Sequence, residues 1–200
     1  MKQIIVTLVL LLSSLGAVSA QSASEWLAKL DSSLGERYAM DIAVSMGGEL
    51  PLDGFFMVDG DGYYITLGAI EVYSDGKFRY EVNNDRKEVV EDMVDLTSCD
   101  LLSNPTRAFD FVPEEFYSEV ASIANESVAL LLTPKSKSLG ITSITLMLAI
   151  KGASVEPTTI SYDYDGDMVT MTLTKLPSDG LKLRKWDKLA YRAYDIVSFL

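Results

Sequence analysis

The sequence contains no histidine and a single cysteine, Cys99, and these absences exclude several kinds of chemistry. Without histidine the chain cannot form a Ser-His-Asp or Cys-His catalytic unit, and it lacks a common ligand of zinc. A lone thiol cannot form an internal disulfide bond, and no histidine is present to activate it as a nucleophile. We therefore expect Cys99 to be a small, partly buried residue, and we expect no cofactor and no metal.

Basic residues are also scarce. The chain has 17 Lys and Arg against 29 Asp and Glu, a net charge of -12 and a pI near 4.4. A nucleic-acid binder needs a basic face that neutralises phosphates, so we expect no nucleic acid among the partners.

One stretch departs from this acidic composition. Five basic residues are interleaved with Leu and aromatic residues between Leu181 and Arg192: Lys182, Arg184, Lys185, Lys188 and Arg192. This pattern fits a surface that meets an anionic membrane or an acidic partner. It fits equally a charged flank of a strand or loop.

Residues 1–20 have the three-part layout of a cleaved secretory signal peptide. Lys2 precedes an apolar run, and the small residues Val18-Ser19-Ala20 suit cleavage before Gln21. The apolar run breaks at Ser13-Ser14, which leaves it too short for a membrane-spanning helix. The sequence therefore predicts a signal peptide at 1–20 and one exported, soluble domain at 21–200 with a net charge of -13 after loss of Lys2. Without disulfide bonds this domain must be held by its own core.

One helical pattern precedes a long series of strands. Trp26, Leu27, Leu30 and Leu34 share one face of a helix over 24–34, with Ser24 or Ser22 as its N-cap. A second short helix is expected from Pro105 through Phe109, capped by Asn104. Elsewhere apolar and polar residues alternate between turn signals, which predicts strands. They lie at Tyr38–Met46, Gly54–Val58, Tyr63–Leu67, Ile70–Tyr73, Lys77–Val82, Lys87–Val94, Tyr117–Ile123, Ser127–Thr133, Ile141–Ile150, Thr158–Tyr164, Met168–Leu176 and Tyr194–Leu200.

These elements predict a mainly β (α+β) fold with one large curved antiparallel sheet of roughly ten strands. Two or three short helical segments cover little of so wide an apolar face. A hydrophobic ligand in the concavity is one way to complete the cover.

Two acidic motifs could carry chemistry, but each has a structural interpretation. The stretch Asp163–Asp167 begins like a calcium loop, yet its glycine is at the fourth position and its twelfth residue is Thr174, so we favour a hairpin turn. The same holds for Asp59–Gly62. The carboxylates at Glu114-Glu115 and in 88–95 could form a glycosidase pair, but alternation spreads those of 88–95 over both faces of a strand. We expect no enzymatic activity.

Several motifs, in this order, resemble the periplasmic outer-membrane lipoprotein carrier (LolA-like) family. They are Val72-Tyr73-Ser74-Asp75-Gly76-Lys77 continuing to Tyr80 and Asn83, Asn104-Pro105, Leu131-Leu132-Thr133-Pro134-Lys135, and Asp195-Ile196-Val197. The resemblance covers nearly all of residues 21–200. It implies a single strongly curved antiparallel sheet, an incomplete β-barrel with short helices covering the open side. In the family, the cavity of this barrel shields the acyl chains of lipoproteins between the two membranes.

The resemblance also implies a set of cavity and lid residues, with orientations inferred from alternation. They are Trp26, Leu30, Tyr38, Met40, Ile42, Phe56, Ile65, Leu67, Phe78, Tyr80, Leu146 and Leu148. Two positions depart from the family: Tyr80 stands where well-studied members have Trp, and Asp59–Gly62 stands where many carry a basic residue and proline that latch the lid.

The expected function is a periplasmic carrier with an acylated lipoprotein or lipid as cargo. The resemblance implies an inner-membrane donor complex and an outer-membrane acceptor as partners, and we expect a monomer. The alternative is an envelope interaction module that keeps the fold without transporting anything.

Overall fold

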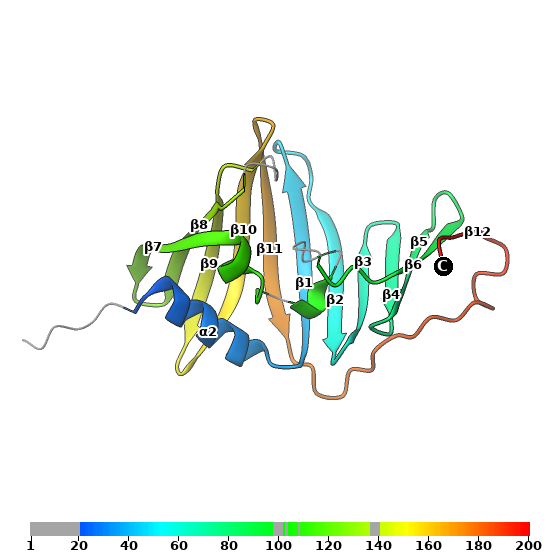
Figure 1. The fold of residues 1–200 in the computed structure, drawn as a ribbon, viewed down its shortest axis with the longest axis horizontal. Coiled ribbons are helices and arrows are strands. Elements are labelled where there is room, and N and C mark those ends of the chain that lie inside the picture. Colours follow the sequence, from blue (N-terminus) through cyan, green and yellow to red (C-terminus); the bar gives the residue numbers. More distant parts are fainter. Residues whose placement is uncertain (1–20, 98–101, 103, 108, 137–140) are drawn as a thin grey trace, which may run out of the picture.

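Within the residues that the computed structural model describes (21–97, 102, 104–107, 109–136 and 141–200), twelve strands form one open, curled sheet (Figure 1). The predicted signal peptide and Cys99 lie outside the described residues. In chain order the strands are β1 (Arg37–Met46), β2 (Leu52–Asp59), β3 (Gly62–Leu67), β4 (Ile70–Ser74), β5 (Phe78–Asn83), β6 (Glu88–Met93), β7 (Phe116–Ala124), β8 (Ser127–Pro134), β9 (Ile144–Lys151), β10 (Ser154–Tyr164), β11 (Asp167–Leu176) and β12 (Asp195–Ser198).

The order across the sheet is β12-β6-β5-β4-β3-β2-β1-β11-β10-β9-β8-β7. Neighbours in sequence are mostly neighbours in space, as hairpin connections require. The exception at the centre is the pairing of β1 with β11, which joins two hairpin series into one sheet. Because β12 and β7 are the two edges and do not meet, the sheet is an incomplete barrel, as the sequence predicted.

The turn motifs form hairpins, as expected. Tyr164 pairs with Asp167 across the turn, where Asp165 and Gly166 have φ of 54° and 91°. Gly166 N–H donates to the Asp163 carboxylate at 3.0 Å, so this carboxylate stabilises the turn. Asp59 pairs with Gly62 across a similar hairpin. No group of three potential metal-ligating His, Cys, Asp or Glu residues occurs in the described part of the chain.

Irregularities help the sheet to curl. The register of β10 against β9 shifts between Pro157 and Thr159, and that of β7 against β8 shifts between Val120 and Ser122. Such bulges bend a strand and increase its twist. Gly54 lets the backbones of β2 and β3 approach each other closely, because a Cβ at this position would lie 2.3 Å from the Thr66 carbonyl oxygen.

In the described ranges, three short helices lie on the concave side. Helix α2 (Ala23–Leu34) begins with a capping box, in which Ser22 Oγ accepts from Glu25 N–H and the Glu25 carboxylate accepts from Ser22 N–H. It contacts β10 and β7. The 3₁₀ helix η1 (Pro105–Arg107) contacts β2 and β3, and α3 (Val112–Glu115) contacts β7. The described helices between β6 and β7 thus lie on the same face of the sheet that α2 covers (Figure 1).

The last strand is reached by a long crossing that we call the strap (residues 177–194). It leaves β11, runs past β1 to β3 and brings β12 to the edge beside β6 (Figure 1). There β12 pairs parallel to β6, whereas the ten other strand pairs within the described residues are antiparallel. The expectation of antiparallel strands is therefore wrong for this last strand, because no hairpin fixes its direction.

No helix in the described residues is both long and apolar enough to span a bilayer.

Candidate functional site

The concave face of the sheet is a continuous apolar surface that α2 and the described parts of 102–116 cover. Because side chains alternate along a strand, every second residue of the central strands points to this face. The cluster includes these buried side chains from α2, the sheet and the 109–116 segment: Trp26, Leu27, Leu30, Leu34, Tyr38, Met40, Ile42, Phe56, Val58, Tyr63, Ile65, Val72, Phe109, Phe111, Val112, Phe116, Val128, Leu130, Leu132, Leu146, Leu148, Val155, Met171 and Leu173.

Most of the cavity and lid residues expected from the sequence meet in this cluster. Nine of them are buried there: Trp26, Leu30, Tyr38, Met40, Ile42, Phe56, Ile65, Leu146 and Leu148. Leu67 is half-buried and packs against them. Their contact with a ligand stays a prediction, but the structure brings them together on one face.

The inward orientation expected for Tyr80 is wrong. Tyr80 packs in a second cluster on the opposite, convex face, where its ring stacks on Trp186 with centroids 4.6 Å apart. Phe78 lies two residues earlier in β5 and therefore shares that face. The alternating pattern of β5 was predicted correctly, but the face to which its apolar side chains point was not. These side chains point to the convex side, where the strap covers them.

The concave face becomes polar where β5 begins to contribute to it. Since Tyr80 and Val82 face outward, Arg79 and Glu81 face inward, and they form an ion pair of 2.7 Å. The apolar face therefore extends from β3 and β4 across the centre to β8, and this pair lies at its boundary.

Sequence reasoning missed the aromatic part of the cover. Phe109, Phe111 and Phe116 are buried against the sheet, and Arg107 lies 5.8 Å from the Phe111 ring. A short helix was expected only from Pro105 through Phe109, and the aromatic residues that follow it have no strand or helix period. Their concentration within eight residues was the available signal.

Helix α2 is tied to the sheet by polar contacts at its C-terminal end. Ser33 Oγ accepts from Val155 N–H at 3.0 Å, and Lys175 Nζ donates to the Ser33 carbonyl oxygen at 2.7 Å. At the other end of the helix, the indole Nε1 of Trp26 is buried and has no hydrogen-bond partner among the described residues. The helix is thus fastened at Ser33, and the rest of its contact with the sheet is apolar packing.

The Ser33 contact gives a first test. We expect Ser33→Ala to lower the free energy of unfolding by about 1 kcal/mol, because it leaves the N–H of the buried residue Val155 without its acceptor. Ser32→Ala is the matched control, since Ser32 Oγ donates only to Ala28 O within the helix. Urea unfolding would measure both. Equal losses in the two variants would contradict a tie between α2 and β10.

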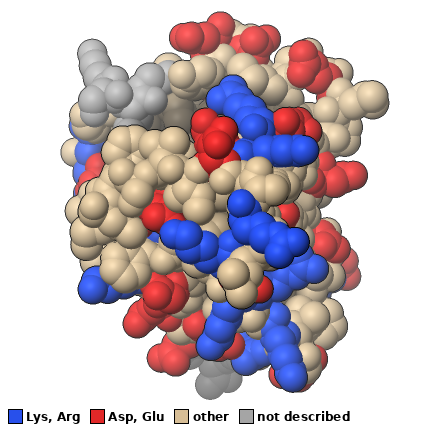
Figure 2. Space-filling model, turned by 90° about the vertical axis from the view of Figure 1, so that its right-hand side faces the viewer, with Lys and Arg blue, Asp and Glu red and all other residues tan. Residues whose placement is uncertain are grey.

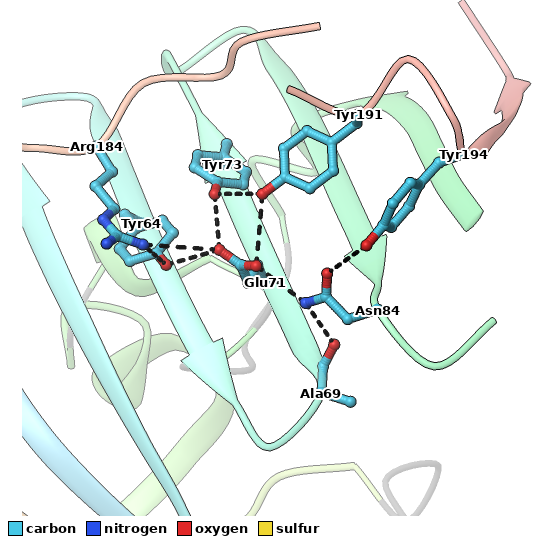
Figure 3. Close-up of polar contacts among 8 residues, drawn as sticks. All are labelled: Tyr64, Ala69, Glu71, Tyr73, Asn84, Arg184, Tyr191 and Tyr194. Carbon is cyan, nitrogen blue, oxygen red and sulfur yellow. Dashed lines mark hydrogen bonds and ion pairs between the residues drawn. The ribbon is translucent and has the colours of Figure 1, made fainter. Parts of the chain in front are cut away.

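Opposite this face, the strap is held on the convex side by a polar network (Figure 3). Glu71 in β4 is its centre: its carboxylate accepts from Tyr64 at 2.9 Å, from Tyr73 at 2.7 Å and from Asn84 at 2.9 Å. Strap residues join it. Tyr191 hydroxyl lies 2.8 Å from that of Tyr73, and Arg184 donates to Tyr64 at 2.8 Å. Tyr194 also donates to Asn84 at 3.0 Å.

This network sets the ionisation of Glu71. Burial alone would raise the pKa of the Glu71 carboxyl, but the hydrogen bonds from Asn84, Tyr73 and Tyr64 and the nearby Arg184 outweigh it and lower the pKa. A lowered folded-state pKa means that the ionised carboxylate stabilises the fold. This stabilisation is complete above about pH 4.5 and is lost as the pH falls through the folded-state pKa.

Glu71→Gln should therefore lower the free energy of unfolding at neutral pH by about 1–2 kcal/mol, because the substitution replaces the charged acceptor of these hydrogen bonds by a neutral one. The difference from the unmodified chain should shrink as the pH falls below about 4.5. Urea unfolding at several pH values measures this. A difference that grew on acidification would have the wrong sign for a carboxyl with a lowered pKa.

An aromatic stack adds to the hold on the strap. Trp186 lies between two rings, with centroid distances of 4.6 Å to Tyr80 and 5.0 Å to Tyr191 and interplanar angles of 8° and 7°. Stacked pairs contribute beyond their buried area. The strap is therefore anchored by Trp186 and Tyr191 together with Leu183, which also belongs to the convex cluster.

No protein-family model matches the chain, and no curated protein matches its sequence. Among solved structures, an uncharacterized conserved protein from Thermus thermophilus matches with a TM-score of 0.54 and 11% identity over 88% of this chain and 98% of that one. A putative outer membrane lipoprotein-sorting protein domain from Vibrio parahaemolyticus matches with a TM-score of 0.44 and 10% identity over 85% and 96%. A LolA superfamily protein from Nitrosomonas europaea matches with a TM-score of 0.36 and 11% identity over 86% and 98%.

The likeness to the Thermus protein shows a shared fold, and at 11% identity it shows the fold alone. Structures named for the LolA superfamily and for lipoprotein sorting are among the matches, as the sequence resemblance predicts. Within the described residues, that fold is an open, curled sheet with short helices on its concave side.

Proposed function

We propose that this protein is a periplasmic carrier that shelters the acyl chains of a lipoprotein, or of another lipid, against the concave face of its sheet. The observation that carries the proposal is that this wide apolar face is covered mainly by one amphipathic helix and a short aromatic segment. Burying acyl chains would stabilise the complex by about 0.8 kcal/mol per CH₂ without any chemical step. The proposed action is therefore binding and release, not catalysis.

The described interior is filled with side chains, which defines how cargo must enter. Leu30 of α2 and the sheet residues Phe56, Leu146 and Leu148 are fully buried. Acyl chains therefore reach the face only if part of its cover moves aside, and we assign that movement to α2. Its polar fastening at Ser33 supports a movement about the C-terminal end of the helix, with Trp26 at the end that travels furthest.

Fluorescence quenching can test entry beneath α2. The chain has two tryptophans, Trp26 under the helix and Trp186 in the strap. In Trp186→Phe only Trp26 reports, and in Trp26→Phe only Trp186 reports. We expect a fatty acid brominated on its acyl chain to quench Trp26 and to leave Trp186 unchanged, because the cargo lies on the concave side.

The outcome also decides between this proposal and its alternative. If α2 stays in place, the interior remains filled with side chains and cannot take up cargo. The protein would then act as an envelope interaction module that uses only its surface. In that case the brominated chain would quench neither tryptophan, or it would quench Trp186 at the surface. Leu148→Asp is a further arm: it should abolish quenching of Trp26, while circular dichroism checks that the variant is folded.

The proposed location and partners follow from the same proposal. Export through the predicted signal peptide at 1–20 would place the carrier in the periplasm. A donor at the inner membrane and an acceptor at the outer membrane would load and unload it, and the acceptor must bind the acyl chains more strongly than the carrier does. The absence of the family's arginine and proline at Asp59–Gly62 implies that the lid is held differently, and Ser33 with Lys175 is the fastening that we assign to that role.

A further inference from the structure

The strap concentrates positive charge on an otherwise acidic protein. Residues 181–192 carry five basic residues and one acidic residue, Asp187, whereas the whole chain has a net charge of -12. Figure 2 shows Lys and Arg side chains gathered in a band over the side of the molecule on which the strap and β12 lie. The sequence left open whether these residues form a docking surface or a solvated flank.

The residues of the strap divide into those that pack on the sheet and those that are exposed. Leu183, Trp186 and Tyr191 pack onto the convex cluster, and the residues between them are exposed. Because the aromatic stack and the Glu71 network fix these anchors, the basic side chains are displayed from a held backbone. A solvated flank would need no such anchoring.

Part of the charge remains available for a partner. Arg184 lies 3.9 Å from Glu71, and Lys188 lies 3.8 Å from Glu91, yet both side chains are 67% exposed. Lys182, Lys185 and Arg192 form no ion pair among the described residues.

Exposed apolar side chains accompany the charge. Leu189 follows Lys188 in the turn before β12 and is 78% exposed, and Phe199 beyond β12 is 68% exposed. Lys and Arg beside exposed large apolar residues are typical of segments that lie at an anionic bilayer surface, where the charges meet headgroups and the apolar groups enter the interface. An acidic protein partner would use the charge but would leave Leu189 without a role.

We propose that the strap is a docking surface for an anionic phospholipid bilayer. In this orientation the concave face with α2 points away from the headgroups, and the strap face approaches the bilayer. The contact is electrostatic and reversible, with Leu189 as its apolar component. This inference concerns the convex side and does not depend on cargo binding beneath α2.

Vesicle binding tests the proposal. The purified protein is sedimented with vesicles of phosphatidylcholine alone and with an equimolar mixture of phosphatidylcholine and phosphatidylglycerol. We expect binding only to the mixture, with an affinity that falls as sodium chloride is raised. Replacing Lys182, Lys185 and Arg192 together by Gln should weaken this binding at least tenfold, since each such residue near an anionic surface contributes about fivefold.

Matched variants separate the surface from general charge. Replacing Lys29, Lys135 and Lys151 by Gln removes the same amount of charge at positions away from the strap. This control variant should bind the mixed vesicles at least ten times more tightly than the strap variant does. Leu189→Ser should weaken binding several-fold, whereas Leu50→Ser, at a leucine that is 94% exposed on the β1 to β2 connection, should not.

Three results would overturn the proposal. Equal binding to both kinds of vesicle, or equal loss in the two triple variants, would show that the strap does not recognise an anionic surface. Failure of the protein to bind either vesicle while it binds soluble polyglutamate would assign the strap to an acidic protein partner instead. Quenching of Trp26 by brominated fatty acid is measured on the same variants, so loss of docking is distinguished from loss of cargo binding.

Discussion

Phe56→Ala is expected to lower the free energy of unfolding by about 3–5 kcal/mol. Phe56 is fully buried at the centre of the concave face and meets the Tyr38 ring edge-on, with centroids 5.9 Å apart. Truncation would remove its buried area and leave a cavity in the packed concave side. Urea unfolding followed by circular dichroism measures the change.

The neighbouring residue is the matched control. Phe55 lies on the opposite face of β2, where it is half-buried against Tyr64. Phe55→Ala should therefore cost clearly less than Phe56→Ala. If the two variants lost the same stability, the concave side would not be the packed interior that the structure describes.

Trp186→Ala is expected to release the strap and to raise the rate of tryptic cleavage within it at least about fivefold. The two stacked contacts of Trp186 contribute roughly 1–3 kcal/mol, which corresponds to about a 5- to 150-fold change in the population of the open strap. The strap suits this experiment because its five Lys and Arg residues are trypsin sites. Mass spectrometry of the fragments locates the cuts.

The aromatic replacement Trp186→Phe should keep most of the protection, because a ring between Tyr80 and Tyr191 preserves the stack. Cleavage at the same rate in the unmodified chain and in Trp186→Ala would mean that the strap is held by other contacts, of which the Tyr191 and Glu71 bonds are the strongest candidates.

The strands were predictable because each combines two local signals, alternation and a turn. Residues 38–46 illustrate this: Tyr38, Met40, Ile42 and Val44 face the concave side as the alternation requires. Bounds were less accurate where a local signal misleads. Strand β10 begins at Ser154, four residues before the predicted start, because Pro157 marks a bulge and not an end.

The convex side was not predictable from the same signals. Alternation states that Phe78 and Tyr80 share a face, but not which face, and the sheet is apolar on both sides of β4. The strap that buries Tyr80 is distant in sequence and has no regular period. Its placement depends on contacts such as Trp186 with Tyr80 and Arg184 with Tyr64, which become visible only in three dimensions.

In the concave site, too, the residues on regular elements were predictable and the others were not. Ten of the twelve expected residues meet there because they lie on α2 and on regular strands of known phase. Phe111 was missed because it lies outside any long helix or strand, and Phe116 was missed because the predicted strand began one residue later, at Tyr117. The ligand itself is not encoded in any local pattern.

The most direct test of the carrier proposal is native mass spectrometry of the protein purified from the periplasm, together with organic extraction and lipid analysis. The proposal predicts a population whose mass is increased by an acylated species, and it predicts that added acylated lipid exchanges into the protein. Leu148→Asp should lose both. If neither a co-purifying nor an exchangeable acylated species were found, the protein would not be a lipid carrier.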